Sequence, residues 1–440
     1  MPAKPLNQID TIAIVMMENR SFDHMLGFLS HEAFDGRAGI DGLHLHSADF
    51  DWDNPDDAGK LYTPTATPDG FLPADLPHSR SEVDTELAKK TMLGFIKAYF
   101  ATQNTDRTPV PMRFCRPVDV PVTAALARGY SVCDRWHASL PDDTFPNRLM
   151  SLSGYTRIDA TSVVKPPFDL MPDQTTLFDW LVTKGKTFGI YVDAEPIVDV
   201  GPPSSLLMMK SQWTHVVHNG HALSALAGKW KSKQKAPDVL YIEPFFNDFA
   251  TALGLHGNCN HPPLPVAYGE DFLNRVYTIL TSDREKWKRT MMIICYDEHG
   301  GFFDHVAPPA MKYAPPKDHK WSDKTPFKSL GVRVPGIVVS PLVDPGKVFH
   351  ELLDHTSILQ LLVDKFGKPN DLAFFGDAAA RKASGVASLA RTLTRSTPRD
   401  DIPTVPAAPP PNFPFSITPP ISNVGQIFRQ VIAAKPAKQV

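Results

Sequence analysis

Two short apolar runs, each followed at once by acidic or amide side chains, constrain the fold of this chain most. The pairs are Glu18 with Asn19, after residues 11–17, and Asp297 with Glu298, after residues 291–296. Apolar runs of this length without polar alternation are typical of strands buried in a parallel sheet. Because α/β sheets bind ligands beyond the carboxyl ends of their strands, the sequence predicts a cluster of acids at one edge of a sheet.

Carboxylate and amide oxygens at neighbouring strand ends can share one cation. Such ligands suit Ca²⁺, Mg²⁺ or Mn²⁺, and Zn²⁺ also accepts carboxylates, so the pattern indicates a divalent metal ion without selecting its identity. A metal held in this way assists the hydrolysis of phosphate or sulfate esters. A single acid after a strand is more often a helix cap, so the prediction depends on the occurrence of acids after both runs.

Further apolar runs resemble strands and alternate with stretches of helical periodicity. The expected strands span residues 11–17, 187–192, 239–242, 291–296 and 336–340. Residues 269–280 and 357–366 carry their apolar side chains on one helical face. This alternation predicts an α/β fold in which helices cover both faces of a mainly parallel sheet.

The chain is expected to form one catalytic domain over residues 1–382 and an extension over residues 383–440. Residues 34–77 are rich in Asp, Gly and Pro and predict a surface excursion near the site. Nine of the 23 residues from 398 to 420 are proline, which marks the end of the compact domain. The apolar stripe in residues 421–432 predicts a terminal amphipathic helix that docks on its own domain or on another chain.

The composition excludes several classes of protein. The formal net charge is −3, from 45 basic and 48 acidic residues, so the chain has no excess positive charge that would attract nucleic acid. No apolar run is long enough to span a membrane, and no signal peptide precedes the first expected strand. The chain is therefore expected to be cytoplasmic as synthesised, exported without such a signal, or a mature form. The four cysteines show no spacing typical of a metal site, and the sequence does not decide whether Cys115 and Cys133 form a disulfide. It does not indicate the oligomeric state either.

Thr144 is a candidate nucleophile. It lies in a polar turn, and Pro146 favours the start of a helix directly after it. A hydroxyl at a helix N-terminus lies where backbone N–H groups and the helix dipole favour an anion, which helps an alkoxide to form. The alternative is that Thr144 only caps the helix.

Three histidines in loops are candidates for substrate or metal contact: His78, His261 and His305. A neutral imidazole can bind a metal, and a protonated one can bind a phosphoryl oxygen or protonate a leaving alkoxide. Any one of the 16 histidines could equally be a surface or core residue. Their position in loops favours function.

Five motifs in order, from about residue 10 to residue 370, together resemble the bacterial phosphoesterase family. They are Met-Glu-Asn-Arg-Ser-Phe-Asp-His from residue 17, Thr-Phe-Pro-Asn-Arg from 144, His-Pro-Pro from 261 followed by Gly-Glu at 269, Tyr-Asp-Glu-His-Gly-Gly-Phe-Phe-Asp-His-Val from 296, and Asp-His-Thr-Ser from 354. The family includes phosphatidylcholine-preferring and non-specific phospholipases C and a group of acid phosphatases. The resemblance implies an alkaline-phosphatase-like, three-layer α/β/α sandwich.

The resemblance also implies roles for residues. A divalent cation would be held by Glu18, Asn19, Asp297 and Glu298 beside the nucleophilic hydroxyl of Thr144, with Asn19 on the phosphate as well. His78 and His261 match positions that line the phosphate. His305 and His355 lie in matching motifs and are included as substrate-binding candidates, with a structural role as the alternative. For the leaving-group side of the pocket there are two alternatives: the pair Asp193 and Glu195, or the pair His215 and His218.

The resulting hypothesis is a metal-dependent phosphoric ester hydrolase. The resemblance favours a phospholipase C that releases a phosphorylated head group through a phosphothreonine. The alternatives are an acid phosphatase acting on monoesters and a binding protein of the same fold without turnover. A sulfatase is disfavoured because no Cys-x-Pro-x-Arg segment is present. Peripheral membrane contact needs only an apolar rim, for which Phe34, Phe71, Leu72, Phe245 and Phe246 are candidates unless they are buried.

Overall fold

An eight-stranded sheet forms the centre of the computed structural model, with the strand order β14-β6-β13-β10-β1-β9-β7-β8. The structure describes residues 5–44, 52–66, 75–102, 108–163, 170–194, 202–253, 255–410 and 423–434. The sheet strands are β1 (Thr11–Met17), β6 (Ser131–Cys133), β7 (Phe188–Val192), β8 (Gly220–Ala222), β9 (Val239–Glu243), β10 (Thr290–Tyr296), β13 (Gly336–Val339) and β14 (Val348–Phe349). The two central strands, β1 and β10, are buried along their whole length, as their uninterrupted apolar sequences predict.

The strands from β10 to β8 all pair in parallel, and β13 is antiparallel to both of its neighbours. The register of the central pair sets Met17 opposite Tyr296. The next residues of the two strands, Glu18 and Asp297, therefore emerge side by side at one edge of the sheet. The prediction of a mainly parallel sheet is confirmed.

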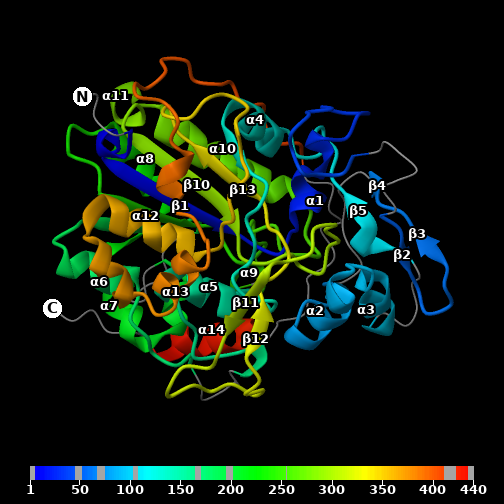
Figure 1. Ribbon diagram of the computed structural model, residues 1–440. Coiled ribbons are helices and arrows are strands. Elements are labelled where there is room, and N and C mark those ends of the chain that lie inside the picture. The colour runs from blue at the N-terminus through cyan, green and yellow to red at the C-terminus, as the bar shows by residue number, and fades with distance from the viewer. Residues whose placement is uncertain are drawn as a thin grey trace.

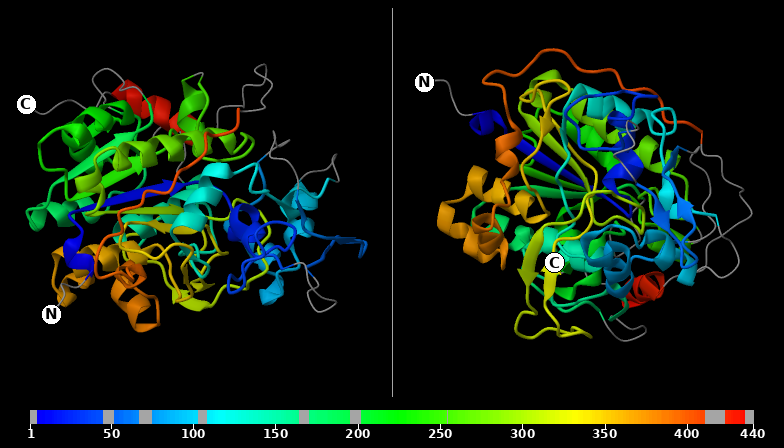
Figure 2. Two further views of the ribbon diagram at one scale, coloured as in Figure 1. Left: turned by 90° about the horizontal axis from the view of Figure 1, so that it is seen from above. Right: turned by 45° about the vertical axis from the view of Figure 1, so that its right-hand side comes forward.

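Helices cover both faces of the sheet, so the fold is the three-layer α/β/α sandwich expected above (Figures 1 and 2). The α-helices are α1 (Phe22–Leu26), α2 (Arg80–Leu87), α3 (Phe95–Thr102), α4 (Pro121–Gly129), α5 (Thr144–Ser153), α6 (Leu177–Thr183), α7 (Trp213–Asn219), α8 (Leu223–Lys231), α9 (Asn247–Ala252), α10 (Ala267–Thr281), α11 (Arg284–Trp287), α12 (Thr356–Phe366), α13 (Ala378–Ala383) and α14 (Asn423–Ala434). Helix α10 packs with α4 and α8, and α12 packs with α5. The helices predicted at 269–280 and 357–366 correspond to α10 and α12.

Short strands outside the sheet belong mainly to the surface excursion and to a late hairpin. They are β2 (Asn54–Pro55), β3 (Leu61–Tyr62), β4 (Thr65–Ala66), β5 (Arg113–Phe114), β11 (Ala310–Tyr313) and β12 (Phe327–Ser329). The excursion lies with α2 and α3 at one side of the molecule (Figure 1). Its last residues, from Asp75 onward, return to the carboxyl edge of the sheet.

The segment of residues 384–410 packs on the domain: Val386, Leu389 and Leu393 are buried, and farther along Tyr277 donates to the carbonyl of Pro403 and Asn274 to that of Pro406. Cys115 and Cys133 are both buried, and no disulfide links them. Among the described residues, no helix has the length and apolar character needed to cross a membrane.

Candidate active site

The residues after β1 and β10 are locked together by backbone geometry. The backbone N–H of Asn19 donates to Asp297 Oδ1 at 3.1 Å, and that of Arg20 donates to the carbonyl of Glu298 at 3.1 Å. Asn19 has a φ of 56°, a left-handed conformation that asparagine tolerates better than most residues. Gly300 has a φ of 64°, and a Cβ there would lie 2.2 Å from the carbonyl oxygen of Asn19. Only glycine permits this approach of the two loops.

Arg148 joins the acids of the two strands. Its Nε lies 3.1 Å from Asp297 Oδ2, and its Nη2 lies 3.4 Å from Glu18 Oε1. All three side chains are buried. Arg148 is one helical turn after Thr144 in α5, so a single helix N-terminus delivers both the hydroxyl and the cation that pairs with the acids.

Thr144 is the first residue of α5, and its hydroxyl lies 3.5 Å from Asn19 Oδ1. The turn before it is fixed by Asn147, whose side-chain amide donates to the carbonyls of Leu140, Asp142 and Asp143. Thr144 is only partly buried and faces a pocket. The local sequence therefore holds a hydroxyl in a rigid turn beside the acids.

The pocket has a volume of about 260 Å³ and lies at the carboxyl edge of the sheet. It is lined by Glu18, Asp75, His78, Asp143, Thr144, Phe145, Thr161, Ser162, Phe246, Asp248, Phe249 and His261. The lining combines one hydroxyl at a helix start, two imidazoles, several carboxylates and three phenyl rings. Such a mixture can bind both an anion and an attached organic cation.

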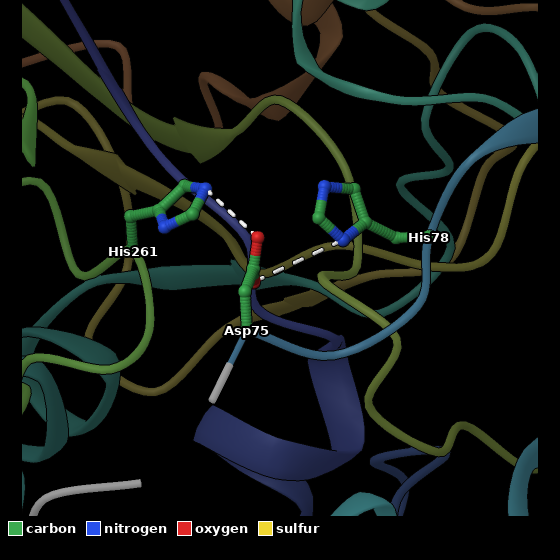
Figure 3. A group of neighbouring side chains, drawn as sticks. All are labelled: Asp75, His78 and His261. Atoms are coloured by element: carbon green, nitrogen blue, oxygen red, sulfur yellow. Dashed lines mark ion pairs between the residues drawn. The ribbon is translucent and has the colours of Figure 1, made fainter. Parts of the chain in front are cut away.

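His78 and His261 face each other across Asp75 (Figure 3). The Nδ1 of His78 lies 2.6 Å from the carbonyl of Leu76, and that of His261 lies 2.5 Å from the carbonyl of Pro262. These contacts orient each ring through Nδ1. The Nε2 of His78 lies 3.3 Å from the side-chain nitrogen of Asn19, and that of His261 lies 3.7 Å from Asp75 Oδ2.

Neighbouring acids favour the protonated form of both imidazoles. Burial lowers the pKa of His78, but Glu298 and Asp75 outweigh burial and raise it to about 10. Burial likewise lowers the pKa of His261, but Asp75 and Glu18 raise it to about 9. Two cationic rings at one pocket suit the oxygens of a phosphoryl group.

The acids of the two strand ends are candidate ligands for a divalent cation. Glu18 Oε2 and Glu298 Oε1 are buried and find no hydrogen-bond partner among the described residues. Burial, and then the nearby Asp297, raise the pKa of Glu18 to about 8. Burial and Glu298 raise the pKa of Asp297 to about 6 although Arg148 opposes them. Carboxylate oxygens without partners, beside like charges, are what a bound cation would satisfy.

Comparison with known proteins identifies the family. Residues 9–369 match the family model described as Phosphoesterase family. The chain belongs to this family. It is 31% identical over 412 residues to non-specific phospholipase C6 of Arabidopsis thaliana, covering 90% of this chain and 74% of that protein. It is 29% identical over 406 residues to phospholipase C A of Mycobacterium tuberculosis, covering 83% and 74%. The protein is therefore a phosphoric ester hydrolase.

Among solved structures, a phosphonate monoester hydrolase of Agrobacterium radiobacter overlaps with a TM-score of 0.33 at 10% identity. The overlap covers 82% of this chain and 77% of that one. A likeness at this level does not bear on the function of the phosphoesterase, which must be argued from its own residues.

Two histidines predicted near the substrate lie away from the pocket lining of this phosphoesterase. His305 Nδ1 lies 2.6 Å from Asp23 Oδ2, and its Nε2 lies 3.0 Å from Asp41 Oδ1. His355 lies behind the acids, where its Nε2 donates to the carbonyl of Asp297 at 2.6 Å and its Nδ1 accepts from Trp136. With both ring nitrogens engaged, the geometry favours structural roles for His305 and His355.

The candidates for the leaving-group side also lie outside the lining. Asp193 is paired with Arg275 and accepts from Asn258, and His215 is paired with Asp179. Glu195 is outside the described residues. These partners make Asp193 and His215 part of the surface structure.

Several lining residues escaped the sequence reasoning: Asp75, Asp143, Asp248, Phe145 and Phe249. Arg148 could have been found, because it closes the Thr-Phe-Pro-Asn-Arg motif. Of the proposed apolar rim, Phe245 and Phe246 are buried, Phe34 is partly buried, and Phe71 and Leu72 lie outside the described residues. Membrane contact stays a prediction.

Proposed function

We propose that this phosphoesterase is a metal-dependent phospholipase C in which Thr144 is the nucleophile. The observation that carries the proposal is a hydroxyl at a helix N-terminus, 3.5 Å from Asn19, beside buried carboxylate oxygens without partners. The names of the relatives reported above support the same reaction class. An acid phosphatase and a non-catalytic binding protein are the alternatives that the test below must exclude.

The cation would be held by Glu18, Asn19, Asp297 and Glu298, with Thr144 at its edge. When bound, a divalent ion supplies Lewis-acid stabilisation of negative charge on oxygen. Arg148 keeps Glu18 and Asp297 in place and offsets part of their charge. The identity of the metal is not selected by these ligands.

The reaction is a double displacement at phosphorus. The hydroxyl of Thr144 releases its proton to solvent as its oxygen forms a bond to phosphorus, and the bond from phosphorus to the glycerol oxygen breaks, which leaves diacylglycerol and a phosphothreonine diester. His78 and His261, both protonated, bind phosphoryl oxygens, and one of them gives a proton to the departing glycerol oxygen. Water then cleaves the phosphothreonine bond and releases the phosphorylated head group.

The pocket lining favours a head group that carries a positive charge. Asp75, Asp143 and Asp248 supply negative charge, and Phe246 and Phe249 contribute the aromatic part of the lining. A quaternary ammonium binds well between carboxylates and aromatic rings. We therefore propose phosphocholine diesters as preferred substrates over plain monoesters.

The test compares p-nitrophenylphosphorylcholine, p-nitrophenyl phosphate and p-nitrophenyl sulfate, each with and without a strong chelator. We expect the choline diester to be turned over fastest, the chelator to abolish turnover, and Thr144→Ala to be inactive. Thr144→Ser keeps the hydroxyl and is the matched control, with activity retained in part. Faster turnover of the monoester would support an acid phosphatase, full activity of Thr144→Ala would reject the nucleophile, and no turnover at all would favour a binding protein.

A further inference from the structure

The C-terminal helix α14 packs against the wall of the pocket. The ring of Phe428 is fully buried and stacks on Phe249 of α9, with ring centroids 4.1 Å apart and an interplanar angle of 17°. Helix α14 also packs against the 3-10 helix Ser205–Met208. It lies at one edge of the molecule, far along the chain from α9 but beside it in space (Figure 1).

A series of side-chain contacts leads from the stacked Phe249 to the acids. Phe249 lies 5.3 Å, between ring centroids, from Phe246, and both rings line the pocket. The guanidinium of Arg148 lies over the ring of Phe246, 4.5 Å from its centroid. Because Arg148 contacts Glu18 and Asp297, an unbroken series of contacts runs from α14 to the acids.

Helix α9 is short, and α14 is one of the elements that pack against it. It has only six residues, too few for a helix to hold its shape without tertiary contacts. The residues that follow it, Leu253 and Leu255, are exposed and add no packing. Phe428 stacks on Phe249 and is not itself among the residues that line the pocket.

We propose that Phe428 is a positioning residue for substrate selection, which holds the aromatic wall of α9 in place for a cationic head group. This inference rests on the proposed function, because it concerns the part of the substrate beyond the phosphate. Phe428 touches no reacting atom and acts through Phe249. Its loss should therefore weaken binding of the choline group and leave phosphoryl chemistry nearly unchanged.

The experiment measures KM and kcat for p-nitrophenylphosphorylcholine and p-nitrophenyl phosphate in the full-length protein. We expect Phe428→Ala to raise KM for the choline diester by about three- to tenfold, the range of an aromatic contact, with little change in kcat. KM for the monoester should stay within about twofold of the wild type. Gln426→Ala, on the exposed side of α14, is the matched control and should behave as the wild type.

Two further variants separate positioning from general stability. Phe428→Leu keeps most of the apolar volume and should recover part of the preference for the choline diester. Phe249→Ala with Phe428→Ala should be no worse than Phe249→Ala alone, because Phe428 acts through that ring. Equal losses on both substrates, or an unchanged KM in Phe428→Ala, would overturn the inference. A wild type without preference for the choline diester would overturn both this inference and the choline specificity proposed above.

Discussion

Two groups of buried acids lie near the carboxyl edge of the sheet, and they differ in how their charge is balanced. The pocket acids are Glu18, Asp297 and Glu298. The Arg333 network consists of Asp23, Asp304, His305 and Arg333. Both follow the same pair of strands, and both contain residue types that bind metals.

The Arg333 network is complete in itself. Arg333 lies 2.8 Å from Asp304 Oδ1 and 3.0 Å from Asp23 Oδ1, and it also donates to two backbone carbonyls. The remaining oxygen of Asp23 accepts from His305, and that of Asp304 accepts from the backbone of Asp23. The ligand atoms of Asp23, Asp304 and His305 lie within 4.8 Å of one another, yet all of them have protein partners.

The pocket acids are incomplete by comparison. Arg148 pairs with only one oxygen each of Glu18 and Asp297, and Glu18 and Glu298 each retain a buried oxygen without a described partner. Among the described residues, proximity alone would select two groups as metal sites: Asp23, Asp304 and His305 of the Arg333 network, and Asp75, His78 and His261 of the pocket. The balance of hydrogen bonds favours the pocket acids, and for this reason we propose catalysis for the pocket acids and stability for the Arg333 network.

The largest effect is expected from removing one pocket acid. Glu298→Gln should lower kcat/KM for p-nitrophenylphosphorylcholine by about a thousandfold, because metal-assisted charge stabilisation is worth several kcal/mol. With a chelator present in both samples, the free energy of unfolding in urea should change little, since the substitution removes a charge that lacks a full set of partners. His305→Asn is the control and should retain kcat/KM within about threefold. Similar losses of kcat/KM in both variants would contradict the difference proposed between the pocket acids and the Arg333 network.

Breaking the Arg333 network should reduce stability. Arg333→Met leaves Asp23 and Asp304 buried without their cation, which costs about 3–5 kcal/mol of unfolding free energy. Urea unfolding followed by circular dichroism measures this change. The protein that remains folded should still cleave the ester. A variant with unchanged stability and no activity would reverse the assignment.

The two histidines outside the pocket should give opposite pH dependence. Burial lowers the pKa of His355 to about 4, so its contribution to stability is present above about pH 6.5 and is lost as the pH falls toward 4. Burial also lowers the pKa of His305, but Asp23 and Asp41 raise it to about 9. Its contribution is present below about pH 6.5 and is lost as the pH rises through 9.

Urea unfolding at a series of pH values checks this prediction. His355→Asn should flatten the acid side of the stability profile, and His305→Asn should flatten the alkaline side, each by about 1–3 kcal/mol. If both variants changed the same side of the stability profile, the environments assigned to His305 and His355 would be wrong.

A smaller effect is expected from removing the cation. A ligand present at about a hundred times its Kd stabilises the folded state by about 2.7 kcal/mol, so a chelator should lower the unfolding midpoint of the wild type. Thermal unfolding with and without the chelator measures the shift. Arg333→Met should show the same shift from its lower starting point, and Glu298→Gln should show none. A shift that persists in Glu298→Gln would place the cation elsewhere.

The sequence predicted those parts of the site that depend on residues adjacent in the chain. Uninterrupted apolar runs located β1 and β10, and their shared edge brought Glu18 and Asp297 together. Thr144 was found because a turn followed by proline marks a helix start. These features need only strand ends and a helix N-terminus, which neighbouring residues determine.

The remaining features depend on contacts between remote segments. Asp75 reaches the pocket at the end of a long excursion, and Phe249 is fixed by a helix that follows a proline-rich stretch. The spacing of apolar residues along the sequence predicts neither contact. His261 and His305 both lie in family motifs, but only burial and partners separate a pocket residue from a structural one.

Metal content of the purified protein tests the central claim most directly. The wild type, Glu298→Gln and His305→Asn would be dialysed against Ca²⁺, Mg²⁺, Mn²⁺ or Zn²⁺ and then against buffer, and the bound metal measured by mass spectrometry. The account predicts one tightly bound ion per chain in the wild type and in His305→Asn, and none in Glu298→Gln. An ion retained by Glu298→Gln and lost from His305→Asn would contradict it.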